Sequence, residues 1–145
     1  MKLTRASEYG VRCIIYLSNQ GKGVLAKRRE IAKSMKIPDQ FLGKIAQNLA
    51  KSGIIEIIQG ARGGFRLLIS PEKLTLLTVI EAEIGEIFLN DCVIKSQSCQ
   101  WHSTCAVHKV WAKARNQLRN TLNEVTFAQL LVDETCLDIF FNSKT

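Results

Sequence analysis

The segment from 37 to 68 (IPDQFLGKIAQNLAKSGIIEIIQGARGGFRLL) changes its apolar spacing part-way along, and this restricts the folds open to the chain. After Pro38, which suits the first turn of a helix, apolar residues recur at helical spacing: Phe41, Leu42, Ile45, Ala46 and Leu49. Past Gly53 the pattern becomes that of two short strands, 54–58 and 65–69, around a glycine-rich turn. A short helix followed by a basic, glycine-rich hairpin is typical of a winged helix-turn-helix.

The other face of this helix is polar and contains no acid. It carries amides and cations, namely Gln40, Lys44, Gln47, Asn48 and Lys51, while Arg62 occupies the hairpin tip. Acids there would repel phosphates, and glycines let a DNA backbone come close. We therefore expect the helix to enter a major groove and the hairpin to touch an adjacent backbone or minor groove. The alternative is a helix packed on a hairpin with a merely solvated polar face.

Two more helices are expected before this segment. Thr4 is a good cap for a first helix that breaks at 19–21, in which Cys13 is expected to be a small buried hydrophobe and Glu8 to be solvated. A second helix opens at the basic triplet 27–29 and ends near residue 36, so that a tight break leads into the polar-faced helix. Within the triplet, Arg28 and Arg29 either touch phosphate or form soluble surface.

Composition and charge favour a nucleic-acid ligand. Residues 1–73 hold 14 Lys and Arg against five Asp and Glu, whereas residues 74–145 hold six against eight. The basic half is thus the half with the winged-helix pattern. No apolar run is long enough to span a bilayer and the first residues lack a signal-peptide core, which predicts a cytoplasmic protein without a membrane partner. No catalytic constellation is evident, so an enzyme is not expected.

Three cysteines and a histidine cluster in the polar region that follows a further expected helix at 74–84. The spacing is Cys92, Cys99, Cys105 and His108. Thiolates are soft, charged donors for iron and zinc, and an imidazole one helical turn past the last cysteine supplies a fourth donor. Gaps of six, five and two residues lack the tight pairs of zinc fingers, and a long wrapping loop suits an iron–sulfur cluster. Structural zinc remains the alternative.

The residues from 107 to 125 predict a long amphipathic helix. Its apolar stripe comprises Val107, Val110, Trp111, Ala114, Leu118, Leu122 and Val125. Because the winged helix already supplies a core, we interpret this stripe as the seam of a homodimer. The tail beyond it, with Cys136, Phe140 and Phe141, is expected to cover apolar surface.

Several of these segments together resemble the bacterial regulators of the IscR, NsrR and RirA family. The similar segments are MKLTRASEYGVRCIIYL, the IA-x-x-x-x-I-P-x-x-F-L turn, L-x-K-S-G-I-I, the GGFRL wing and the three-cysteine loop, and they cover about residues 1–131. Two features depart from the IscR-like pattern. The first cysteine gap is wider, and Gln59 and Lys44 replace an arginine at the wing and a glutamine on the recognition helix.

The resemblance implies a homodimer with crossed long helices and cluster loops near the partner's first helix. It implies a 2Fe–2S cluster on Cys92, Cys99, Cys105 and His108, as in IscR-like members. In NsrR-like members an acid on the partner's first helix completes a 4Fe–4S site, and Glu8 stands at that position. Of the two, the 2Fe–2S site with His108 is the favoured hypothesis.

These observations predict a mostly α protein with a small β wing and four parts. They are a winged helix-turn-helix domain (1–85), a cluster-binding loop (86–106), a dimerisation helix (107–126) and a tail (127–145). The expected function is a transcription regulator that binds a double-stranded DNA operator and senses iron, redox or nitric oxide status. An iron–sulfur carrier or redox protein, which would need no recognition helix, and a regulator with structural zinc are the alternatives.

Overall fold

The chain in the computed structural model starts with three helices, as the sequence predicts. Residues 3–101 and 103–132 are described, which leaves His102, Cys136, Phe140 and Phe141 outside. Helix α1 (Arg5–Gln20) begins where the Thr4 side chain accepts a hydrogen bond from the Ser7 amide, and it ends at Gly21. Helices α2 (Arg28–Met35) and α3 (Asp39–Lys51) are joined by a tight turn, and Gly53 follows α3 with a φ of 73°.

The predicted hairpin is present and is anchored to the body close to its turn. Strands β1 (Ile55–Ile58) and β2 (Gly64–Leu67) pair antiparallel, with Ile55 opposite Leu67 and Ile58 opposite Gly64. Next to Gly64, the Phe65 amide donates to the Ala26 carbonyl, and the Ala26 amide donates back to Phe65. A Cβ at Gly64 would lie 2.2 Å from the Ala26 carbonyl oxygen, so this close approach requires glycine.

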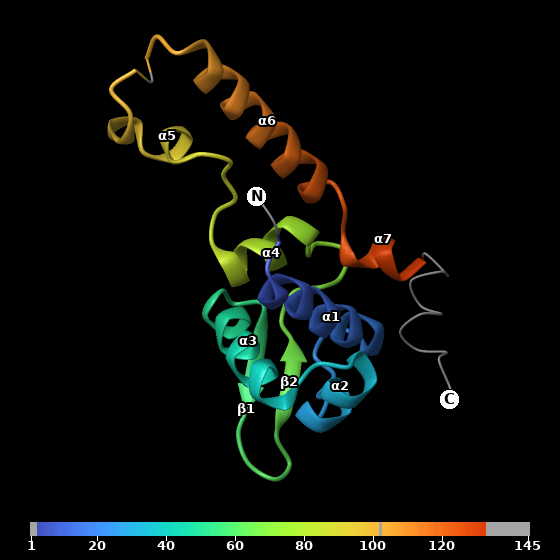
Figure 1. The fold of residues 1–145 in the computed structure, drawn as a ribbon. Coiled ribbons are helices and arrows are strands. Elements are labelled where there is room, and N and C mark those ends of the chain that lie inside the picture. The colour runs from blue at the N-terminus through green and yellow to red at the C-terminus, as the bar shows by residue number, and fades with distance from the viewer. Residues whose placement is uncertain (1–2, 102, 133–145) are drawn as a thin grey trace.

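One apolar core joins these elements to the segments that follow. Helix α4 (Leu76–Ile84) lies along α1, and helix α7 (Phe127–Val132) also packs against α1 (Figure 1). Fully buried side chains come from every part of this body: Ile14, Leu17, Ile31, Met35, Leu42, Leu49, Leu67, Val79 and Phe127. Phe127 opens the predicted tail, so the first residues of that segment are part of the core. Phe41, expected on the buried face of α3, is instead 49% exposed beside Tyr9.

The remaining elements form an arm that projects away from the body. Figure 1 shows helix α5 (Asp91–Ile94) and the 3-10 helix η1 (Ser96–Ser98) on one side of the arm and helix α6 (Ala106–Asn123) on the other. No side chain of α6 is buried. At the base of the arm, Leu118 and Leu122 pack against a small cluster of Leu77, Ile80 and Ile87. No helix of the described ranges has the length and hydropathy needed to cross a membrane.

The fold class predicted from sequence is therefore confirmed, with one difference in detail. The structure is mostly helical with one two-stranded antiparallel sheet. The difference lies in the region expected to be a loop (86–106), which contains α5 and η1. These elements have four and three residues, too few to show an apolar period. The Asn90 side chain accepts a hydrogen bond from the Asp91 amide and so caps α5.

Candidate DNA interface and cysteine loop

An open groove of about 710 Å³ runs between helix α3 and the hairpin. Its walls come from the start of α2, from one face of α3 and from the wing, and they include Lys27, Arg29, Gln47, Gln59 and Gly60. Basic and amide side chains beside an open glycine-rich turn suit the negatively charged backbone of a duplex. The groove thus lies on the side of the body where the sequence predicts DNA.

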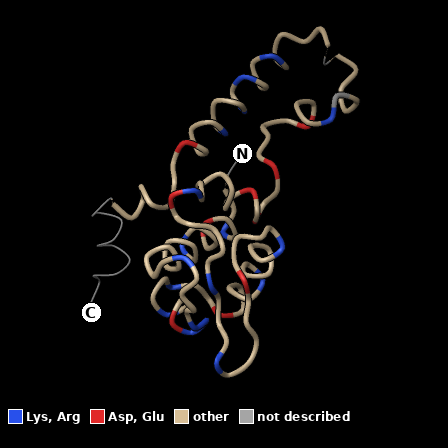
Figure 2. The backbone as a smooth tube through the Cα atoms, turned by 180° about the vertical axis from the view of Figure 1, so that it is seen from behind, with Lys and Arg blue, Asp and Glu red and all other residues tan. Residues whose placement is uncertain are grey.

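Most of the side chains predicted to bind DNA are exposed around this groove. Gln40, Lys44 and Gln47 lie on the solvent side of α3, and Arg29 lies near the start of α2. Gln59 and Arg62 belong to the exposed hairpin turn. Figure 2 shows a blue, basic segment at the tip of the hairpin. Among the described residues, Arg62 has no ion-pair partner, so its charge is available to a ligand.

Arg28, predicted to touch phosphate or to form soluble surface, lines the groove and is 42% exposed, and it also makes an ion pair within the chain. Its Nε and Nη2 atoms donate to the Asp39 carboxylate, each at 3.0 Å, and Nη2 also donates to the Asp39 carbonyl at 2.6 Å. A Cβ at Gly43 would lie 2.9 Å from Arg28 Nη2, so this glycine makes room for the guanidinium. Arg28 therefore joins the start of α2 to the first turn of α3. The acid at Asp39, beside the acid-free face, is neutralised by this pair.

Asn48, also predicted to bind DNA, makes a hydrogen bond to a helix of the body. Its Nδ2 atom donates to Glu83 Oε2 of α4 at 3.1 Å, and the side chain is partly buried. Asn48 therefore faces the body, whereas Gln47 beside it faces solvent. The partner lies 35 residues further along the chain, and no spacing rule within α3 indicates it.

The environment of Glu83 is unusual for a carboxylate. Burial raises its pKa from 4.5 to about 7, and the hydrogen bond from Asn48 opposes this rise. Within the described residues, its second oxygen, Oε1, is buried without a hydrogen-bond partner. A buried charge with one unsatisfied oxygen is costly, so the neutral form gains at physiological pH.

Helices α5 and α6 bring two of the four predicted cluster ligands together. Cys105 is the N-cap of α6, His108 lies one turn inside that helix, and Cys92 lies on α5. The distance between His108 Nδ1 and Cys92 Sγ is 3.4 Å, although 16 residues separate them. Both side chains are partly buried. The packing of α5 on α6 thus turns the first and last donors of the sequence motif toward each other.

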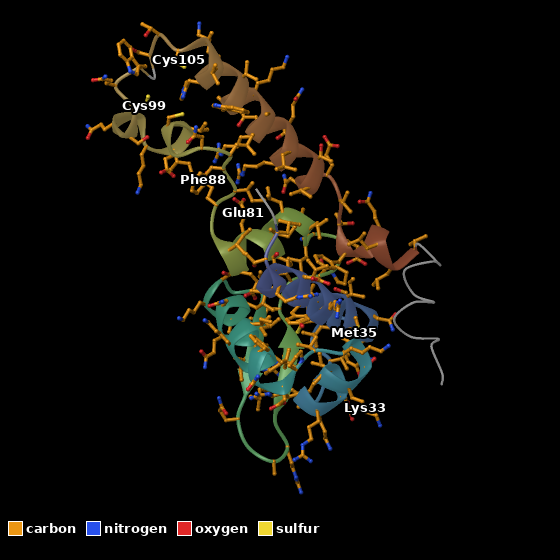
Figure 3. All side chains as sticks on the ribbon, viewed as in Figure 1. Lys33, Met35, Glu81, Phe88, Cys99 and Cys105 are labelled. Carbon is orange, nitrogen blue, oxygen red and sulfur yellow. The ribbon has the colours of Figure 1, made fainter. Side chains whose placement is uncertain are left out.

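The other two thiols lie on the same arm. Figure 3 shows Cys99 and Cys105 near its outer end, far from Lys33 and Met35 on α2. Both are partly buried and neither forms a disulfide. In the described parts of the chain, no three His, Cys, Asp or Glu side chains converge closely enough to hold a single metal ion. The donors thus share one arm but do not form a tight mononuclear cage.

Two residues named from the sequence lie away from this arm. Glu8 is on the exposed side of α1, where its carboxylate pairs with Arg5 at 3.3 Å and with Arg12 at 2.7 Å. Cys13 is fully buried in the core, as expected. Burial, and then the charge of Glu83, raise the pKa of the Cys13 thiol to about 12, which keeps it protonated and unreactive.

Comparison with known proteins shows which family this chain, with its winged helix and cysteine arm, belongs to. The sequence model of the Rrf2 family, described as iron-dependent transcriptional regulators, matches residues 3–133. The chain belongs to the Rrf2 family. The family resemblance seen in the sequence is thereby confirmed, and the chain is a helix-turn-helix transcriptional regulator that binds DNA, not an enzyme.

Individual relatives agree with this assignment over nearly their whole length. The chain is 28% identical over 145 residues to the HTH-type transcriptional regulator NsrR of Halalkalibacterium halodurans, covering 99% of each protein. It is 25% identical over 139 residues to the regulator IscR of Vibrio parahaemolyticus, covering 96% of this chain and 82% of that one. The structure of CymR, the global cysteine regulator of B. subtilis, shares the fold with a TM-score of 0.73 at 20% identity, covering 91% and 97% of the chains.

Proposed function

We propose that this Rrf2-family regulator carries an iron–sulfur cluster on Cys92, Cys99, Cys105 and His108, and that the state of this site controls DNA binding. The observation that carries the proposal is the 3.4 Å contact between Cys92 and His108, since it pairs the two ends of the motif. Three thiols and an imidazole are the donors that iron–sulfur clusters use. The wide spacing of the thiols favours a multi-iron cluster over one zinc ion, whose ligands would converge more tightly. When bound, the cluster would supply a redox-active, oxidant-sensitive group.

His108 is a better fourth ligand than Glu8 of a second copy. The imidazole already lies beside Cys92, so little rearrangement of α6 is needed. Glu8, in contrast, would have to leave the guanidinium groups of Arg5 and Arg12. This difference favours the 2Fe–2S site over a 4Fe–4S site completed across a dimer.

The proposal includes a homodimer formed through α6. The outer part of the helix presents Val107, Val110 and Trp111 to solvent, and these are 51%, 60% and 38% exposed. A second α6 crossing the first would cover this stripe. Dimerisation would also set the distance between two recognition helices, which must match half-sites on the duplex. A change in the arm would then alter DNA affinity through dimer geometry.

Purification without oxygen tests the cluster. The wild-type chain is expected to be brown and to contain iron and acid-labile sulfide, whereas Cys92→Ala and His108→Ala lose the cluster or change its absorbance and electron paramagnetic resonance spectra. Cys13→Ala and Lys109→Ala are the matched controls, since Cys13 is in the distant core and Lys109 is the exposed neighbour of His108.

A colourless wild-type protein with stoichiometric zinc would overturn the proposal in favour of structural zinc. An unchanged spectrum in His108→Ala, combined with loss in Glu8→Ala, would move the fourth ligand to the partner subunit. DNA binding is measured separately, on a duplex selected by the wild-type protein from a random pool.

A further inference from the structure

Helix α4 lies between the arm and the recognition helix, and two of its carboxylates face these two neighbours. Glu81 accepts a hydrogen bond from Arg119 of α6 at 2.6 Å and another from the Ile87 amide, at the start of the arm, at 2.7 Å. Glu83 accepts the bond from Asn48 of α3. Figure 3 shows Glu81 at the junction of arm and body. One short helix is therefore joined by side chains to both the arm and the recognition helix.

The third neighbour of α4, helix α1, confines Glu83 from the other side. A Cβ at Gly10 would lie 2.8 Å from Glu83 Cγ, so the side chain rests directly on the backbone of α1. The absence of a side chain at Gly10 thus opens the space in which Glu83 reaches α3. On α3, the side-chain amide of Asn48 donates a hydrogen bond to Glu83. The sequence alone predicts that Asn48 contacts DNA.

We propose that Glu83 is a positioning residue that fixes the recognition helix α3 on α4 by its hydrogen bond to Asn48, so that Asn48 acts on DNA through this bond and does not read a base. The inference rests on DNA binding by the family. The proposed cluster enters only as the source of a signal that would pass from the arm to α4. Its consequence is that Asn48 and Glu83 contribute to DNA discrimination as one unit. The exposed amides and cations of α3, Gln40, Lys44 and Gln47, contribute independently.

The groups that face Glu83 leave the bond undisturbed by other charges. From α1, the titratable group is the Cys13 thiol, whose raised pKa keeps it neutral. From α3, the facing group is the uncharged Asn48 amide. On α4 itself, Glu81 is engaged with Arg119. An exchange of donor and acceptor between positions 48 and 83 therefore tests the bond directly.

The experiment compares the full chain with Asn48→Asp, Glu83→Gln and the double variant, all purified without oxygen. Dissociation constants are measured by fluorescence anisotropy for the selected duplex and for a scrambled duplex of equal length. Asn48→Asp puts two carboxyl groups together, and we expect it to lower the preference for the selected duplex at least about tenfold. In the double variant, Glu83→Gln supplies an amide donor to the new carboxylate at position 48. The preference for the selected duplex should then return to within about threefold of the wild-type value.

Two controls separate positioning from other effects. Glu72→Gln removes the same charge from an exposed position and should leave the preference unchanged. A new acid weakens binding to any duplex by electrostatic repulsion, and binding to the scrambled duplex measures this effect. Dividing the dissociation constant for the scrambled duplex by that for the selected duplex cancels it. Circular dichroism establishes that each variant is folded. If Asn48→Asp does not fold, the cycle of Asn48→Ala and Glu83→Ala replaces it, and the double variant should be no weaker than the weaker single variant.

The inference would be overturned if the double variant Asn48→Asp, Glu83→Gln did not regain the preference for the selected duplex. It would also be overturned if the losses of Asn48→Ala and Glu83→Ala multiplied in the double variant. Either result would indicate that Asn48 contacts DNA directly. Neither outcome bears on the cluster, because iron and sulfide are measured on the same preparations. A protein without iron that still shows the rescue would contradict only the proposed function. A protein with full iron and no rescue would contradict only the role of Glu83.

Discussion

At the scale of single residues, Glu83 also makes stability depend on pH. Its pKa is about 7 in the folded chain, above the value of 4.5 expected when exposed, so the folded state binds this proton more tightly. The resulting stabilisation is complete below pH 4.5 and is lost as the pH rises through 7.

We expect Glu83→Gln to reduce the loss of stability between pH 5 and pH 8. The wild-type chain should lose about 1 kcal/mol more than the variant over this interval, a value lowered for screening because the carboxyl is only partly buried. Urea unfolding at the two pH values measures the difference. Equal losses in both proteins would show that Glu83 titrates normally in the folded state.

Residues that act through sequence neighbours could be predicted, and those that act through distant partners could not. Thr4 as a cap and Gly53 as a helix stop follow from local rules, and both are confirmed. Arg28 and Asn48 have their partners 11 and 35 residues away, on other helices. Their orientation depends on how α2, α3 and α4 pack, which a one-dimensional pattern does not contain.

At the scale of elements, α6 is used in two ways along its length. Leu118 and Leu122 close the base of the arm within the chain, whereas Val107, Val110 and Trp111 remain exposed. The sequence shows one continuous stripe and cannot divide it, because both halves are equally apolar. A substitution at Leu118 would therefore damage the arm itself, and the dimer is better tested nearer the outer end.

Val110→Glu is expected to make the protein monomeric at micromolar concentration. The new charge would be buried without a partner in the proposed seam, at a cost on the order of several kcal/mol. Sedimentation velocity measures the change. Asn116→Glu is the matched control, since Asn116 is exposed and lies on the opposite face of α6 by helical periodicity. A dimeric Val110→Glu protein would place the interface elsewhere.

At the scale of the whole molecule, the basic charge predicted from the N-terminal half gathers on the body, and Cys92, Cys99 and Cys105 lie on the arm. Figure 2 shows blue segments on the hairpin tip and on the helices around it, and others along α6. The order of the main helices and of the hairpin could be predicted from periodicity. The placement of Phe127 in the core could not, because a six-residue helix gives no sign of its packing partner.

Arg62→Ala is expected to weaken binding to the selected and the scrambled duplex alike. The exposed guanidinium at the wing tip would contact phosphate and carry no sequence information. The slope of log K against log salt should become shallower by about one charge. Lys113→Ala on the arm, which removes the same charge far from the groove, should leave the slope unchanged. An unaltered slope in Arg62→Ala would exclude the wing tip from the interface.

The absence of any buried side chain on α6 has a consequence for hydrogen exchange. A helix of 18 residues with no buried side chain, packed on α4 at its base and on the four-residue α5 further out, opens easily, since most helical stability in proteins comes from tertiary packing. Its outer amides, around Val107 and Val110, should therefore exchange quickly in dilute protein and slowly once a second copy covers them. Amides of α3 should exchange slowly at every concentration, because Leu42 and Leu49 hold that helix in the core. Protection of the arm would thus be shared between two chains, whereas the DNA-binding body would keep its structure alone.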